Sequence, residues 1–114
     1  MAAIRRNFDH VLRMLRKECP LKSPMRVVSR DLQAERLCGS CSTYLTMAGE
    51  IDRFVIEIDS NLNQVSAIDT LLHEWAHAMD LERYGLATES HRDSWGRCYA
   101  RVWRAYVAKT DSTN

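Results

Sequence analysis

The sequence predicts an α+β fold, a small three-stranded and mainly antiparallel sheet packed with three helices. Apolar residues recur at helical spacing near both ends of the chain and in one long central segment, whereas apolar and polar residues alternate between Phe54 and Asp59. A length of 114 residues predicts a single domain, residues 1–114. With 46% hydrophobic and 27% charged residues, the composition excludes a disordered chain or a coiled-coil rod.

The three predicted helices are amphipathic. The first ends before Pro20, the second covers residues 65–84 and stops at Gly85, and the third begins near Ser90. The apolar positions that define their buried faces are Ile4, Phe8, Val11, Leu12, Leu15, Val65, Ile68, Leu72, Trp75, Ala76, Met79, Trp95, Cys98, Tyr99, Val102 and Tyr106.

Strand patterns occupy the region between the first two helices. Residues 25–29 read as a short strand, a second lies within residues 40–47, and Gly49 marks the turn that follows. The third strand places Phe54, Ile56 and Ile58 on one face. The segment from Asn61 to Asn63 is a connector with helix-start chemistry ahead of the long helix.

The long helix contains the motif H-E-x-x-H, at His73, Glu74 and His77. Residues four apart lie above one another on a helix, so both imidazoles can reach one metal ion. Glu74 is turned by about 100° and can face the same cleft as a general base. The motif predicts one Zn²⁺ per chain and hydrolysis of peptide bonds by a zinc-activated water.

A third protein ligand is needed for a catalytic zinc site. His91 and Glu89 both follow the turn at Gly85, where a returning helix brings them over the first two ligands. We expect His91 to be the ligand, because Trp95 lies one turn on and can anchor the helix that carries it. Glu89 is the alternative.

Other groups near the motif have less defined roles. Asp80 lies one turn beyond His77 and is expected either to orient a ligand imidazole or to lie on the helix surface. An oxyanion also needs a donor, and a peptide substrate is expected to lie along an exposed sheet edge. The candidate donors are Tyr84, Tyr44 and Arg92.

The segments 54–59, 70–78 and 91–95 resemble those of the SprT-like zinc metallopeptidases, which are zincins. In that family a strand precedes the H-E-x-x-H helix, and a third histidine opens the next helix four residues before an aromatic residue. The resemblance covers roughly residues 53–97. It implies a zincin-like core with His73, His77 and His91 as zinc ligands and Glu74 as general base. Arg92 stands where the family commonly has Gly.

The four cysteines and the first residues favour a reducing compartment. Residues 1–20 lack a continuous apolar stretch, which predicts a cytoplasmic protein with free thiols and no membrane segment. Cys38 and Cys41 form a single C-x-x-C, for which turn or packing thiols are preferred over a second zinc site or a redox pair. Cys98 is expected to be a core thiol.

Charge is distributed unevenly. Residues 49–90 contain nine acidic and two basic residues, whereas both flanking segments are basic. Arg97, Arg101 and Arg104 share one face of the last helix and are expected to be solvated rather than to track phosphates. The main alternatives to a monomeric peptidase are therefore a zinc-bearing binding or regulatory module without appreciable activity and a nucleic-acid-associated protein that uses its basic terminal helices.

Overall fold

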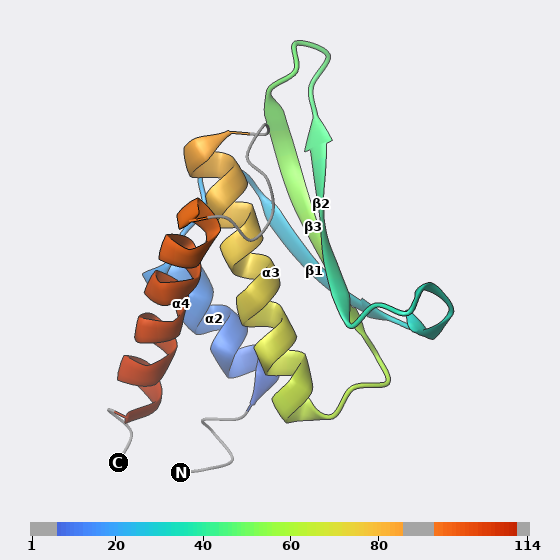
Figure 1. Ribbon diagram of the computed structural model, residues 1–114, viewed down its shortest axis with the longest axis vertical. Coiled ribbons are helices and arrows are strands. Elements are labelled where there is room, and N and C mark those ends of the chain that lie inside the picture. The colour runs from blue at the N-terminus through green and yellow to red at the C-terminus, as the bar shows by residue number, and fades with distance from the viewer. Residues whose placement is uncertain (1–6, 86–92, 112–114) are drawn as a thin grey trace.

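The computed structural model describes residues 7–85 and 93–111, and it confirms the predicted α+β class. The elements are α2 (Phe8–Glu18), β1 (Met25–Arg30), a 3-10 turn η1 (Gln33–Glu35), β2 (Gly39–Leu45), β3 (Ile51–Asp59), α3 (Gln64–Tyr84) and α4 (Asp93–Asp111). The helices gather on one side of the sheet, with α3 lying between the sheet and α4 (Figure 1). Within the described ranges, no helix is both long and apolar enough to cross a membrane.

The sheet is mixed, where the sequence predicted mainly antiparallel pairing. Its strand order is β1-β3-β2, so β3 is central and β1 and β2 are the two edges. β1 pairs with β3 in parallel and β2 pairs with β3 antiparallel. The chain reverses once between β1 and β2 and again in the hairpin, so β3 returns in the direction of β1 and inserts beside it.

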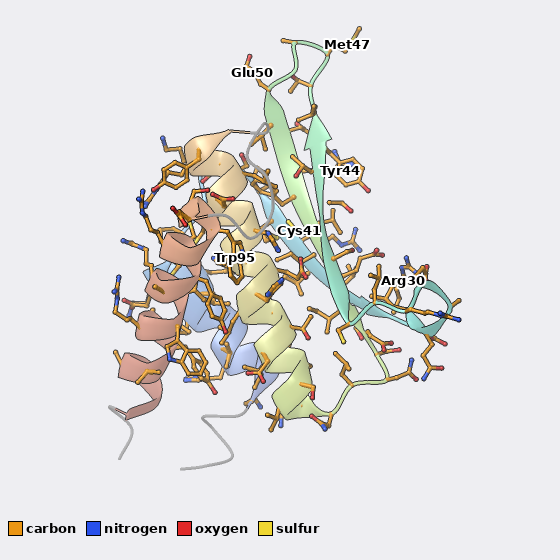
Figure 2. The ribbon with its side chains drawn as sticks, in the orientation of Figure 1. Arg30, Cys41, Tyr44, Met47, Glu50 and Trp95 are labelled. Carbon is orange, nitrogen blue, oxygen red and sulfur yellow. The ribbon has the colours of Figure 1, made fainter. Side chains whose placement is uncertain are left out.

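The β2–β3 hairpin closes at the predicted turn. The Thr46 amide donates to the Glu50 carbonyl at 2.8 Å, and Gly49 donates back to Thr46 at 2.9 Å. Gly49 has a φ of +84°, which a residue without a Cβ adopts readily. The tip projects beyond the helices, with Met47 at its end (Figures 1 and 2).

The core lies between the sheet and the helices, with α3 at its centre. Phe54 and Ile56 are fully buried, and Ile58 is 3% exposed, which confirms the predicted alternation in β3. Trp75 of α3 is 1% exposed, and its indole N–H donates to the Cys19 carbonyl at 2.9 Å. This bond ties the end of α2 to the middle of α3.

Local signals fix both ends of α3. The Asn63 side chain accepts from the Ser66 amide at 2.8 Å, as an N-cap does. At the other end Gly85, with a φ of +95°, donates to the Leu81 carbonyl. These caps hold the helix in register against β2 and β3, and this register decides which of its side chains face the cleft.

Helix α4 packs along α3 through the predicted stripe. Cys98 and Val102 are buried, and Trp95, Tyr99 and Tyr106 are partly buried against the same core. The prediction that Cys98 is a core thiol is therefore confirmed. The expected start of this helix near Ser90 lies outside the described residues.

Candidate active site

Helix α3 places the two histidines of the motif together. The Nε2 atoms of His73 and His77 are 3.1 Å apart, and the ring centroids are separated by 4.7 Å. Both side chains are partly buried, on the helix face turned toward α4 rather than into the apolar core. The spacing of four residues thus produces the convergence of imidazoles that the sequence predicts.

This geometry fits a zinc ion. Two nitrogen ligands of a tetrahedral zinc, each at 2.0–2.1 Å, lie about 3.3 Å from one another, close to the separation of the His73 and His77 Nε2 atoms. The same separation accommodates an N–H···N hydrogen bond when one Nε2 carries a proton. The His73 and His77 rings therefore need to move little to change from a hydrogen-bonded pair to a pair that binds one metal ion.

Neither residue predicted as a third ligand is among the described residues. His91, its alternative Glu89 and the candidate donor Arg92 all lie in residues 86–92, outside the described ranges. Within residues 7–85 and 93–111, no group of three or more His, Cys, Asp or Glu side chains is arranged to hold a metal. The roles of these three residues stay predictions.

Trp95 holds the histidine pair from the side of α4. Its ring centroid lies 4.9 Å from that of His73 and 5.5 Å from that of His77. Tyr99, one turn further along α4, stacks on Trp95 at 4.9 Å with an interplanar angle of 11°. The aromatic surface restricts the rotamers of both imidazoles, which prepares them to bind one ligand together.

Glu74 lies between α3 and the sheet. Its side chain is 8% exposed, and burial raises its pKa to about 7. A carboxyl group with this pKa can both accept and return a proton near neutral pH. The sequence placed Glu74 in the cleft, but its desolvation follows from the way β2 covers the helix.

The C-x-x-C residues lie beside Glu74 and do not form a reactive pair. Cys41 faces α3 from β2 (Figure 2), and burial together with the charge of Glu74 raises the pKa of its thiol to about 12. Such a thiol stays protonated at neutral pH, so it is a poor nucleophile. Cys38 is exposed at the mouth of the same cleft, and all four cysteines are free.

Gly39 allows the start of β2 to approach α3 closely. A Cβ at this position would lie 2.5 Å from Thr70 Cγ2 and 2.8 Å from the Glu57 carbonyl oxygen. Any larger residue must therefore push the strand away from the helix at the level of Glu74. This role of Gly39 could not be predicted from the sequence, because a glycine at a strand end carries no signal of what it approaches.

A cleft of about 540 Å³ opens where β2, α3 and α4 meet. The groups lining it are Cys38, Gly39, Asp69, Thr70, His73, Glu74, Tyr99 and Trp103. Asp69 and Trp103 were not predicted as cleft residues. The available signal was their spacing, since Asp69 precedes His73 by one turn, and Trp103 follows Tyr99 by one turn.

Asp80 is buried between α3 and α4, so the helix-surface alternative is wrong. Its side chain is 2% exposed, and within the described residues its Oδ1 has no hydrogen-bond partner. It lies near Cys98, whose pKa is raised by burial and then by the charge of Asp80. A buried acceptor one turn beyond His77 fits the predicted role of orienting an imidazole N–H.

The two tyrosine candidates for oxyanion donor differ. Tyr84 is the last residue of α3, 43% exposed and two turns beyond His77. The Tyr44 side chain points away from the helices (Figure 2). Tyr44 pairs with Arg53 of β3, and its ring lies 4.2 Å from the Arg53 guanidinium. The Tyr44 hypothesis is wrong, because the alternation along β2 turns its side chain away from the cleft.

Comparisons with protein-family models, with curated proteins and with solved structures found no match for this chain.

Proposed function

We propose that the protein is a zinc-dependent metallopeptidase. The observation that carries this proposal is the 3.1 Å separation of the His73 and His77 Nε2 atoms beside a buried carboxyl group, Glu74, in an open cleft. His73, His77 and the predicted His91 are the residues that would hold the metal. The resemblance to SprT-like metallopeptidases supports the same activity from the sequence side.

Zinc, when bound, supplies a Lewis acid that polarises the scissile carbonyl and acidifies water. Glu74 takes the proton of the attacking water and later delivers it to the leaving amine. The pKa of about 7 suits both transfers, because neither the carboxylate nor the carboxylic acid is strongly favoured at neutral pH. Trp95 keeps the histidine rings in place while the proton moves.

The edge strand β2 suits an extended substrate. β2 pairs only with β3 in the three-stranded order, and its first residue, Gly39, lines the cleft together with His73 and Glu74. A peptide added antiparallel or parallel to β2 would bring a backbone carbonyl past the histidine pair. The substrate is therefore proposed to be an extended peptide or an unfolded protein segment.

A peptidase assay tests the proposal. Zinc-loaded protein should cleave an unstructured protein substrate, lose activity with a chelator and regain it with added zinc. Glu74→Gln should bind zinc and remain folded but lose activity by 10²-fold or more, since the amide cannot accept the proton. His10→Ala, on α2, is the matched control and should keep full activity. Equal turnover by Glu74→Gln and wild type would exclude Glu74 as the base.

The assay also separates the alternatives. A zinc-bearing binding module would retain stoichiometric metal with no turnover of any unfolded substrate. For a nucleic-acid-associated protein the exposed residues Arg97, Arg101 and Arg104 are the relevant surface, and binding would weaken steeply with salt. Arg101 also contacts the Cys19 thiol, so part of this face is engaged within the protein. A cytoplasmic location and a monomeric state remain parts of the proposal.

A further inference from the structure

We propose that Asp69, Tyr99 and Trp103 form a subsite for a lysine or arginine side chain of the substrate peptide. This inference rests on the proposed peptidase function and adds a substrate preference to it. The three residues line the cleft together with the motif residues His73 and Glu74.

Two helices bring these side chains to one end of the cleft. Asp69 precedes His73 by four residues, so it lies on the same face of α3, one turn toward the start of the helix. On α4 the Trp95 ring contacts both His73 and His77, whereas Tyr99 contacts His73. Helix α4 therefore runs back along α3, and Trp103, one turn further, reaches the level of Asp69.

The aromatic pair offers a surface for a cation. The Tyr99 and Trp103 rings are stacked at 27° with their centroids 6.5 Å apart, and Trp103 is 43% exposed. Tryptophan and tyrosine faces attract ammonium and guanidinium groups within about 6 Å of the ring centroid. A large aromatic side chain that is exposed beside a cleft, as Trp103 is, indicates a binding surface, whereas one buried in the core indicates only packing.

The charge of the cleft selects a basic side chain. Among the residues that the structure describes, the cleft lining contains the carboxyl groups of Asp69 and Glu74 and no lysine or arginine. Asp69 is exposed and makes no salt bridge to another residue of the described ranges. A lysine or arginine side chain can lay its apolar stem on Trp103 and place its charge at Asp69. A phosphate backbone would instead meet this carboxylate and be repelled.

Binding to the inactive Glu74→Gln variant tests the subsite without turnover. We would measure Kd by calorimetry, in chelator and in zinc, for eight-residue peptides with one lysine moved through every position. Each peptide is paired with a norleucine counterpart of equal length and no charge. At one or more positions lysine should bind about fivefold more tightly than norleucine, as a cation–π contact and one partly exposed ion pair allow.

Two substitutions in the Glu74→Gln background locate the effect. Asp69→Asn and Trp103→Ala should each bring the lysine-to-norleucine ratio toward one, whereas Asp52→Asn, an exposed carboxylate on β3, should leave it unchanged. Ratios near one at every position, or a preference that survives both substitutions, would overturn the subsite. Tighter binding of phenylalanine than of lysine peptides would overturn the cationic assignment. A lysine preference without hydrolysis by the wild type would retain the subsite and refute the peptidase.

Discussion

The two sides of α3 differ in the side chains that they present and in how these are buried. Toward the apolar core, its residues Ile68, Leu72 and Trp75 are at most 2% exposed, and the Trp75 indole N–H is hydrogen bonded. Toward the cleft, the same helix presents two imidazoles in contact and a buried carboxyl group, Glu74, whose pKa is raised by burial.

Under the proposed function, this contrast marks the face of α3 where stability is given up for catalysis. A buried carboxyl group without a cationic partner destabilises the folded state when it ionises, and β2 is held against it only because Gly39 has no side chain. Neither the buried Glu74 carboxyl group nor the close approach at Gly39 improves packing. The proposed function accounts for both, because it requires this face to hold a metal ion and move a proton.

We expect the largest loss of stability from a substitution on the face of α3 that packs into the core. Trp75→Ala removes a side chain that is 1% exposed and a hydrogen bond that joins α3 to Cys19. We expect the free energy of unfolding to fall by about 3–5 kcal/mol, measured by chemical denaturation. The prediction that Val65 belongs to the buried face of this helix is wrong, because its side chain is 50% exposed, so Val65→Ala should change the free energy of unfolding by less than about 0.5 kcal/mol. Similar losses for both variants would contradict the assignment of this face to the core.

The buried carboxyl group on the cleft face should make the free energy of unfolding depend on pH. In metal-free protein, burial raises the pKa of Glu74 from its ordinary value of 4.5, which applies to the unfolded chain, to about 7 in the folded state. The unfolded chain therefore releases this proton first as pH rises, so the free energy of unfolding falls between about pH 4.5 and pH 7, by up to about 3 kcal/mol.

Glu74→Gln isolates this contribution, since the amide has no proton to lose. The stability difference between wild type and Glu74→Gln should change by that amount between pH 4.5 and pH 7, with chelator present throughout. Parallel pH profiles for the two proteins would show that Glu74 is not desolvated as described.

A smaller loss of stability is expected where β2 closely approaches α3. Gly39→Ala places a Cβ against Thr70 Cγ2 and the Glu57 carbonyl, and should destabilise the fold by about 1–3 kcal/mol. Thr70→Ser removes Cγ2 but keeps the hydroxyl that donates to the Ser66 carbonyl at 2.8 Å. Denaturation of the double variant should show partial recovery relative to the sum of the two single changes. Strict additivity would mean that the contact is not the cause.

The helices and the central strand could be predicted because their signals are local. The apolar spacing of α3, its Asn63 cap and its Gly85 stop are all present in the sequence, as is the alternation in β3. The parallel pairing of β1 with β3 could not be read in this way. Pairing direction depends on which strand inserts next to which, and that choice is made by packing between distant segments.

The same distinction applies to the site. Spacing four residues apart was enough to predict that His73 and His77 converge. The burial of Asp80, the outward direction of Tyr44 and the place of Trp103 in the cleft depend on how α4 and β2 pack against α3. A sequence shows the residue types of such positions but not the neighbour that gives each one its environment.

Zinc content after exhaustive dialysis tests the central claim most directly. By elemental analysis, wild type should retain one zinc per chain, and His77→Ala should retain almost none, because an incomplete ligand set binds weakly. His91→Ala should lose zinc while Glu89→Ala keeps it, and His10→Ala should match wild type. Equal zinc in wild type and His77→Ala, with both proteins folded, would contradict the account.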